Sequence, residues 1–315
     1  MLQFPDGLLG RPFQRVVDLL KEMEVEPIIS SDPSYGACDL PTDAAERLGI
    51  DVIFHFGHST FVFPTPKTFS GSVHYFPVEA NISVPWDILV GEIRSKSWTR
   101  VGLLLTVQHL RLAQEARQRL GTAGITIEIY REGQILGCNY DRGIRIAPLV
   151  DGFLVIAGGD FHAGPVVIAT GKPTIRYDPF NGSKKFFGND YRNQYLAKRY
   201  AMIQKAKEAK NWGVLLSTKS GQMPADNGKR IIGMLKKAGL NATPFMMSRI
   251  DPLHLTNFET IDAWVISLCP RIATDDYISF NKPILTTREL SVVLGDMQWL
   301  DFISPKAGEE LLTIL

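Results

Sequence analysis

Three sequence blocks recur in the same order at almost the same spacing, and this internal repeat restricts the fold more than any other feature. Each block in the middle of the chain has a counterpart 110 to 112 residues later: VGLLLT at Val101 and GVLLST at Gly213, DGFLVIAGG at Asp151 and DAWVISLCP at Asp262, Lys172-Pro173 and Lys282-Pro283. A fainter copy, IDVIFHFGH, begins at Ile50. Self-similarity at a fixed period indicates repeated structural units.

The blocks are parts of short apolar runs, and helical patterns lie between these runs. Eight runs are predicted strands: Pro27–Ser30, Asp51–His55, Arg100–Thr106, Ile125–Tyr130, Gly152–Ala157, Trp212–Ser217, Ala242–Met246 and Ala263–Leu268. They are unbroken rather than alternating, which is typical of strands covered by helices on both faces. Helices are predicted over Leu110–Leu120 and Asn227–Ala238, and a glycine follows each. This alternation predicts an α/β fold with parallel sheets built from βαβ units.

The length of 315 residues divides evenly into three parts of 105 residues. Together with the repeat offsets, this division predicts three tandem α/β repeats over residues 1–97, 98–208 and 209–315. Each repeat is expected to be a small parallel sheet with flanking helices. The alternative is that any two α/β domains resemble one another at this level of detail.

Composition and charge exclude several classes of protein. Hydrophobic residues are 45% and charged residues 21% of the chain, as in globular proteins rather than disordered ones. The net charge of +1 gives no bulk electrostatic reason to expect binding to nucleic acid or to a membrane surface. The longest apolar stretches are far shorter than the roughly 20 residues that span a bilayer. The N-terminus lacks the pattern of a secretory signal, so a cytoplasmic protein is expected.

The three cysteines, Cys38, Cys138 and Cys269, fall one in each third of the chain. An odd, sparse set argues against a disulfide framework. Each follows a predicted strand, and we expect the three to occupy equivalent loops at carboxyl strand ends, where open α/β sheets bind ligands. Three converging thiolates would form a shared central site, either for zinc with a fourth ligand or for an iron–sulfur cluster with one open iron. The alternative for each cysteine is an inert buried thiol.

The blocks around these cysteines resemble the archaeal-type family of 3-amino-3-carboxypropyl transferases that catalyse the first step of diphthamide biosynthesis. The similar blocks extend over nearly the whole chain: LQFPDGL at Leu2, DPSYGACD at Asp32, HFGHS at His55, ILGC at Ile135, GGDFH at Gly158, RYDPF at Arg176, and CPRIATDDY with NKPILTTREL from Cys269 onward. YGAC and CPRIATDDY with KPILT are specific, whereas ILGC and KP alone are weak signals.

The resemblance implies an atypical radical S-adenosylmethionine enzyme. Cys38, Cys138 and Cys269 match the positions that hold a 4Fe–4S cluster in this family, with the fourth iron left open for S-adenosylmethionine. The family cleaves the bond from sulfur to the methionine Cγ, releases methylthioadenosine and transfers the 3-amino-3-carboxypropyl group to C2 of a histidine imidazole on translation elongation factor 2. The resemblance also implies a homodimer and an electron donor whose identity the sequence does not specify.

Seven further residues are candidates for lining the cofactor pocket, and each has a structural alternative. They lie near the cysteines or the predicted strand ends: Tyr35, Gly36, His55, His58, Asp160, His162 and Arg271. His55 and His58 line the pocket or are hydrogen-bonded structural residues. Asp160 and His162 line the pocket or stabilise their own loop. Arg271 binds the cofactor carboxylate through a bidentate contact, or it pairs with an aspartate of its own loop. Gly36 permits close approach of the backbone to a ligand, or it completes a turn.

Two other hypotheses compete with the transferase. One is a zinc-dependent hydrolase or structural zinc protein with a Cys₃His site that uses His55 or His58. The other is a non-enzymatic partner subunit, because the family works in eukaryotes as a heterodimer of diverged relatives. All three cysteines are present on this chain, which favours a self-sufficient catalytic protomer.

Overall fold

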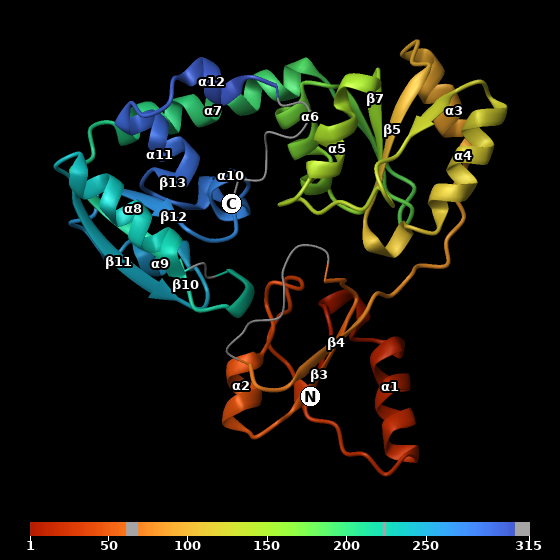
Figure 1. The fold of residues 1–315 in the computed structure, drawn as a ribbon, viewed down its shortest axis with the longest axis horizontal. Coiled ribbons are helices and arrows are strands. Elements are labelled where there is room, and N and C mark those ends of the chain that lie inside the picture. The colour runs from red at the N-terminus through yellow and green to blue at the C-terminus, as the bar shows by residue number, and fades with distance from the viewer. Residues whose placement is uncertain (61–68, 223–224, 306–315) are drawn as a thin grey trace. The chain divides into compact units, whose positions relative to one another are not determined.

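The fold is α/β with three separate sheets (Figure 1). It comes from a computed structural model that describes residues 1–60, 69–222 and 225–305. The described residues form two compact units. The first unit combines those of Met1–Glu79 with those of Ser217–Pro224, and the second combines those of Ala80–Leu216 with those of Ala225–Leu315. The three predicted repeat boundaries stay a prediction.

The first sheet has the order β2-β1-β3-β4 and lies in the first unit. Its strands are β1 (Leu2–Gln3), β2 (Ile29–Ser30), β3 (Val52–Phe56) and β4 (Ser72–Phe76), and all three pairings are parallel. Gln3 pairs with Ser30 on one side and with His55 on the other. Helix α1 (Arg11–Glu22) packs on one core cluster and α2 (Thr42–Arg47) contributes to the other.

The second sheet has the order β6-β5-β7-β8-β9. Its strands are β5 (Arg100–Leu105), β6 (Thr126–Glu128), β7 (Gly152–Ile156), β8 (Thr174–Tyr177) and β9 (Lys184–Phe187). Helices α3 (Trp86–Ser95) and α4 (Leu112–Thr122) bury apolar residues against one face. Helices α5 (Asp141–Ile146) and α6 (Gly164–Thr170) do so against the other. Burial on both faces explains the unbroken apolar runs of β5 and β7.

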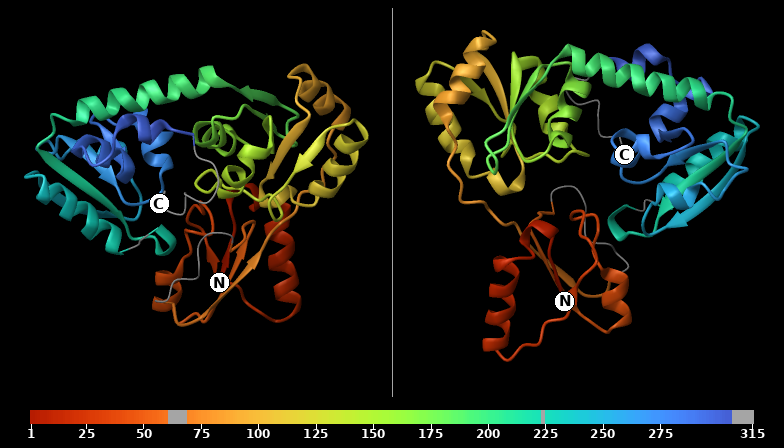
Figure 2. Two further views of the ribbon diagram at one scale, coloured as in Figure 1. Left: turned by 45° about the horizontal axis from the view of Figure 1, so that its top comes forward. Right: turned by 180° about the vertical axis from the view of Figure 1, so that it is seen from behind.

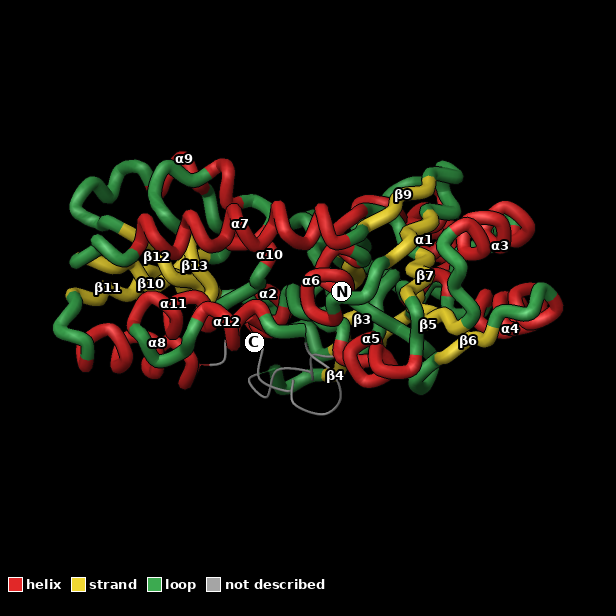
Figure 3. The backbone as a smooth tube through the Cα atoms, turned by 90° about the horizontal axis from the view of Figure 1, so that it is seen from above, coloured by secondary structure: helices red, strands yellow, loops and turns green. Residues whose placement is uncertain are grey.

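The third sheet has the order β11-β10-β12-β13 and is flanked by helices (Figure 3). Its strands are β10 (Asn211–Ser217), β11 (Asn241–Met247), β12 (Ala263–Ile266) and β13 (Ile284–Thr286). One core cluster joins it to α7 (Asn189–Ala206), α8 (Ala225–Lys237), α11 (Thr287–Leu294) and α12 (Trp299–Ile303). The other includes residues of α9 (Pro252–Leu255) and α10 (Arg271–Thr274). Helix α7 leads from the second sheet to the third and packs on α6 and α11 (Figure 2).

All eight predicted strands and both predicted helices are present, with ends shifted by a few residues. The three sheets also share one order, in which the second strand along the chain lies at an edge beside the first, followed by the third and fourth. The prediction of purely parallel sheets is wrong at β9, which is antiparallel to β8. The reason is the short turn between them, closed by the Asp178 N–H donating to the Ser183 carbonyl, because so short a link cannot carry the chain back to a parallel start.

Six short 3₁₀ helices complete the described structure: η1 (Asp6–Leu8), η2 (Val107–His109), η3 (Ala147–Leu149), η4 (Asp160–His162), η5 (Ser220–Gln222) and η6 (Tyr277–Ser279). Two of them, η4 and η5, lie in the segments that follow strands β7 and β10. Across the described ranges, no helix combines the length and the apolar character needed to span a bilayer.

Candidate functional site

Cys38 lies in the loop between β2 and α2, where the described segment after β10 contacts it. The Nε2 of Gln222 donates to the Cys38 Sγ at 3.4 Å, and the Gly221 N–H donates to the Cys38 carbonyl at 3.1 Å. The thiol is partly exposed. Burial raises the pKa of the Cys38 thiol, and the hydrogen bond from Gln222 opposes this rise. Both the backbone and the sulfur of this cysteine are therefore held by a segment far away in the sequence.

Tyr35 and Gly36 lie in the same loop. The Tyr35 N–H donates to Oδ2 of Asp39 at 3.4 Å, and its ring, 60% exposed, lies 5.1 Å from the Lys219 ammonium. The same ammonium forms an ion pair with Oδ1 of Asp39 at 2.5 Å. Gly36 has a φ of 155°, and a Cβ placed there would come 3.8 Å from the Cys38 Sγ. The structure thus places both predicted residues beside Cys38.

His55 and His58 belong to a hydrogen-bonded chain that ends at the Cys38 loop. Gln3 donates through Nε2 to the Asp39 carbonyl at 2.7 Å, so its Oε1 accepts from the His55 Nδ1 at 2.7 Å. Burial, reinforced by His58, lowers the pKa of His55 to about 3, so His55 is neutral. Its Nε2 must then accept from the His58 Nδ1, 2.9 Å away. Both ring nitrogens of His55 are therefore used within the protein.

These hydrogen bonds bear on the zinc hypothesis, in which His55 or His58 is the fourth ligand. A histidine ligates a metal ion through an unprotonated ring nitrogen, and that of His55, Nε2, already accepts from His58, so the zinc hypothesis would have to use His58. Within residues 1–60, 69–222 and 225–305, no three His, Cys, Asp or Glu side chains form a group that could hold a metal ion, and this applies equally to the zinc site and to the three-cysteine cluster site. Cys38 belongs to the first unit, and Cys138 and Cys269 belong to the second.

A pocket of about 500 Å³ in the second unit brings three predicted residues together: Cys138, Asp160 and Arg271 line it. Cys138 lies between β6 and α5. Cys269 is not among the lining residues, although Pro270, the next residue, is. The walls are rich in aromatic side chains, including Tyr140, Phe161, Tyr191, Tyr195 and Tyr277. Burial raises the pKa of Tyr140 to about 12, so this phenol stays protonated.

Arg271 pairs with an aspartate of its own loop, as the structural alternative predicted, but part of its guanidinium remains available to a ligand. Its Nε donates to Oδ2 of Asp275 at 3.0 Å, one helical turn later. Its guanidinium carbon lies 4.0 Å from the Phe161 ring centroid, a cation–π contact. The side chain is 42% exposed. Because Asp275 binds Nε, the two Nη groups are the ones that can reach a carboxylate in the pocket.

Asp160 and His162 occupy η4, directly after β7. Asp160 forms ion pairs with Arg176, at 3.3 Å, and with Lys185. His162 is buried, and burial, reinforced by the positive charge of Arg271, lowers its pKa to about 3. Its Nδ1 is buried without a hydrogen-bond partner among the described residues. Asp160 therefore lines the pocket as a paired carboxylate, whereas the buried His162 is not a lining residue.

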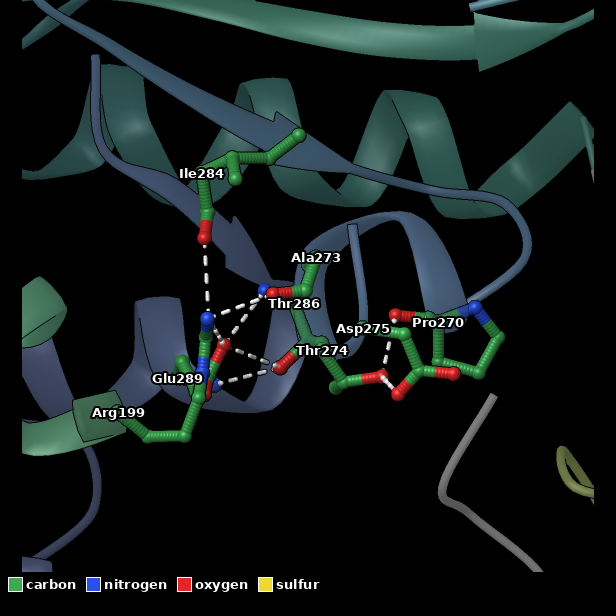
Figure 4. Close-up of polar contacts among 8 residues, drawn as sticks. All are labelled: Arg199, Pro270, Ala273, Thr274, Asp275, Ile284, Thr286 and Glu289. Carbon is green, nitrogen blue, oxygen red and sulfur yellow. Dashed lines mark hydrogen bonds and ion pairs between the residues drawn. The ribbon is translucent and has the colours of Figure 1, made fainter. Parts of the chain in front are cut away.

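Cys269 follows β12, and a buried arginine fixes the turn after it (Figure 4). Arg199, from α7, donates through Nη1 to the Ala273 carbonyl at 2.6 Å and through Nη2 to the Ile284 carbonyl at 3.0 Å. Its Nε and Nη2 also donate to the two Glu289 carboxylate oxygens at 2.6 and 2.7 Å. The two charged side chains are 0% and 2% exposed. The helix that begins two residues after Cys269 is thus tied to α7 and α11.

The expectation that the three cysteines occupy equivalent loops is wrong in one case. Cys38 and Cys138 follow the second strand of their sheets, β2 and β6, whereas Cys269 follows β12, the third strand. All three nevertheless follow a strand at its carboxyl end. The mismatch arises because β12 aligns in sequence with β3 and β7, and the segments after those strands carry His58 and Asp160 instead.

A family model described as "Putative diphthamide synthesis protein" matches residues 4–303. The chain belongs to this family. It is 33% identical to the 2-(3-amino-3-carboxypropyl)histidine synthase of Pyrococcus horikoshii, covering 96% of this chain and 87% of the relative. It is 30% identical to subunit 1 of the same synthase from Gallus gallus, covering 95% of this chain and 73% of the relative.

Solved structures give the same result for the diphthamide synthesis family. The crystal structure of Dph2 from Pyrococcus horikoshii with a 4Fe–4S cluster superimposes with a TM-score of 0.83 at 30% identity, over 98% of this chain and 90% of that one. The resemblance inferred from the cysteine blocks is therefore confirmed. The relatives are named as histidine synthases, so the chain is a member of an enzyme family.

The residues of this family member fit an iron–sulfur cluster in their chemistry. Thiolates are the ligands that such clusters require, and each of the three cysteines is partly exposed at the carboxyl end of a strand. The Cys38 Sγ accepts an amide N–H from Gln222, the kind of contact that tunes cluster sulfurs. Cys138 borders a pocket large enough for a small-molecule cofactor.

Sequence reasoning missed three residues that hold the cysteine loops: Gln222, Lys219 and Arg199. Gln222 and Lys219 contact partners 184 and 180 positions earlier, and no local pattern signals such contacts. Arg199 lies in a polar stretch of α7 that reads as a solvated helix face. One sequence feature could have indicated Gln222: Gly221 and Gln222 lie in the segment after the carboxyl end of β10, and ligand sites form at such strand ends.

Proposed function

We propose that this chain transfers the 3-amino-3-carboxypropyl group of S-adenosylmethionine to C2 of a histidine imidazole on translation elongation factor 2, by a radical mechanism that releases methylthioadenosine. The observation that carries the proposal is the pocket of about 500 Å³ in which Cys138, Asp160 and Arg271 meet, in a chain of the diphthamide synthesis family. The 4Fe–4S cluster of the related Dph2 structure supports a cluster in this chain as well.

The cluster ligands in this proposal are Cys38, Cys138 and Cys269, one from each predicted repeat. When bound, such a cluster supplies one electron for cleavage of a carbon–sulfur bond at an iron without a protein ligand. The chain's own part is to hold the thiolates. Gln222 and Gly221 fix the Cys38 loop, and Arg199 fixes the turn after Cys269. Electron supply requires a separate donor protein or a chemical reductant.

The pocket residues would orient S-adenosylmethionine. Arg271 has its Nε bound to Asp275, so its Nη groups would donate to the cofactor carboxylate. The Asp160 carboxylate lines the pocket and would attract the cofactor's ammonium group, although its ion pairs with Arg176 and Lys185 offset part of its electrostatic field. The aromatic walls, including Phe161, exclude water from a reactive carbon radical. The other residues proposed for cofactor binding are Tyr35, Gly36, His55, His58 and His162.

Protein partners and location follow from this function. The substrate protein is a translation factor, so the enzyme is proposed to act in the cytoplasm. A homodimer is proposed from the family resemblance, and neither nucleic acid nor a membrane is a proposed partner. A zinc hydrolase or structural zinc protein would have to use His58 as the fourth ligand, because His55 uses both ring nitrogens internally.

Anaerobic purification followed by metal and product analysis tests the function. The wild-type protein should be brown, contain about four iron and four sulfide ions per chain, and absorb at about 400 nm. With dithionite and S-adenosylmethionine it should form methylthioadenosine, and with elongation factor 2 the modified histidine. Alanine at Cys38, Cys138 or Cys269 should abolish the absorption, while alanine at the exposed Ser95 should not. Zinc in place of iron, or 5′-deoxyadenosine as the main product, would contradict the proposal.

A further inference from the structure

The segment after β10 is anchored to the Cys38 loop by contacts of different kinds. Lys219 forms an ion pair with Asp39 at 2.5 Å and lies over the Tyr35 ring. The Gly221 N–H donates to the Cys38 carbonyl, and the Gln222 amide donates to the Cys38 Sγ. These groups all belong to the first unit, although about 180 residues of sequence separate them.

Gly221 shows how closely the two backbones approach. A Cβ at this position would come 2.5 Å from the Cys38 Cα and 2.8 Å from its carbonyl oxygen, which no side chain can tolerate without a backbone shift. Gln222 is fixed in turn, because its own N–H donates to the Lys219 carbonyl at 3.0 Å. The Gln222 amide is therefore delivered to the sulfur by a backbone that is already ordered. The hydrogen bond needs little further loss of freedom to form.

We propose that Gln222 is a positioning residue whose amide N–H···S hydrogen bond to Cys38 raises the reduction potential of the cluster. This inference rests on the proposed function, in which Cys38 is a cluster ligand. Hydrogen bonds to the sulfurs are one of the means by which proteins set cluster potentials. Gln222 is neutral, so it stabilises added negative charge on the sulfur without placing a second charge beside the Lys219–Asp39 pair.

The redox step balances simply. One electron passes from an external low-potential reductant to the oxidised cluster, and no bond to the protein forms or breaks. The added charge is shared by the thiolate and sulfide sulfurs, so an N–H donor at Cys38 stabilises the reduced form more than the oxidised form. Removing the donor therefore shifts the equilibrium toward the oxidised cluster. This would reduce the fraction of enzyme able to cleave the cofactor at a given potential.

Redox titration of the anaerobic, cluster-loaded protein tests the inference. Gln222→Met keeps the side-chain length but removes the donor, and Gln222→Glu replaces it with an acceptor. At the wild-type midpoint potential, the ratio of reduced to oxidised cluster, followed by EPR, should fall about fivefold for Gln222→Met and further for Gln222→Glu. Gln14→Met is the control, because the Gln14 side-chain amide donates to the exposed Asp18 on the same helix, α1. It should titrate like wild type.

A second measurement needs no substitution at Gln222. Wild-type protein carrying ¹⁵N only in glutamine side chains, exchanged into D₂O and reduced, should show a glutamine nitrogen and an exchangeable deuteron coupled to the cluster spin. An unchanged titration of Gln222→Met with wild-type iron content overturns the inference, as does the lack of glutamine coupling in reduced wild type. A wild-type protein that binds no iron instead overturns the proposed function, so the two failures are distinguishable.

Discussion

The loops that carry Cys38 and Cys269 are held in opposite ways. The Cys38 loop is fixed by contacts near the surface, chiefly the Gln222 amide and the Lys219–Asp39 pair, whose side chains are 20% and 11% exposed. The turn after Cys269 is fixed by Arg199 and Glu289, which are 0% and 2% exposed. One loop depends on a partly solvated clamp from a distant segment, and the other on an ion pair sealed inside the second unit.

This difference determines what each loop can do. A buried pair that has lost one partner leaves an uncompensated charge, so the contacts that hold the turn after Cys269 are costly to break. A clamp that solvent reaches in part can weaken without unfolding the protein, and the Gln222 amide remains available to adjust the sulfur it contacts. We infer that the contacts around the turn after Cys269 fix its position, whereas the contacts around the Cys38 loop adjust the electronic properties of the Cys38 sulfur.

Substitution of the buried arginine should have the largest effect on stability. Arg199→Met leaves the Glu289 carboxylate buried and unpaired and removes the hydrogen bonds to the Ala273 and Ile284 carbonyls. The free energy of unfolding should fall by about 3–5 kcal/mol. Chemical denaturation followed by tryptophan fluorescence measures it, since Trp212 and Trp264 are buried in the same unit.

The control for this prediction is an ion pair at the surface. Arg100→Met breaks the pair with Glu128, where the arginine side chain is 51% exposed, and should lower the free energy of unfolding by less than about 1 kcal/mol. The double variant Arg199→Met with Glu289→Leu removes both buried charges and should recover part of the loss. Equal effects of Arg199→Met and Arg100→Met would show that the buried pair does not stabilise the Cys269 side.

Acid should lower the free energy of unfolding through His55, which belongs to the row of hydrogen-bonded side chains Gln3, His55 and His58 beside the Cys38 loop. The pKa of His55 is about 3 in the folded protein, below its ordinary value of 6.5. Between these values the unfolded chain binds a proton that the folded chain excludes, so stability falls as the pH drops from about 6.5 toward 3. Each such histidine contributes about 1.4 kcal/mol per pH unit in this window. Unfolding free energies measured from pH 7 to pH 4.5 give this slope.

The His55→Gln variant separates His55 from other acid-sensitive groups. It removes the titrating ring, so its stability should decline less steeply on acidification than that of wild type. His254→Gln is the matched control, because His254 is exposed on α9. An identical acid slope in wild type and His55→Gln would mean that protonation of His55 does not destabilise the Cys38 side.

The sequence predicts the strands and the positions of the cysteines, but not the contacts that hold the Cys38 loop and the turn after Cys269. The strands, the α/β class and the cysteines at strand ends follow from local patterns, because apolar runs and turns are written within a few residues. The clamp by Gln222 on Cys38 spans 184 positions, so only the assembled backbone reveals it. Arg199 was hidden for another reason. Arginine is almost never fully buried unless it is paired, and its partner Glu289 lies 90 residues away.

The smallest predicted effect, that of Lys219→Met, tests whether the Cys38 clamp is solvated as the comparison requires. The Lys219–Asp39 pair is partly exposed, so its loss should lower the free energy of unfolding by only about 0.2–1 kcal/mol. The effect should shrink further between about 0.1 and 1 M salt, because the screening length falls from about 10 to about 3 Å. The loss caused by Arg199→Met should not change over that range, since solvent ions cannot reach a pair that is 0% and 2% exposed. Denaturation of both variants at the two salt concentrations makes the measurement. If the loss of unfolding free energy in Lys219→Met does not depend on salt, solvent ions reach the Lys219–Asp39 pair no better than the Arg199–Glu289 pair. The proposed difference between the two cysteine loops would then be wrong.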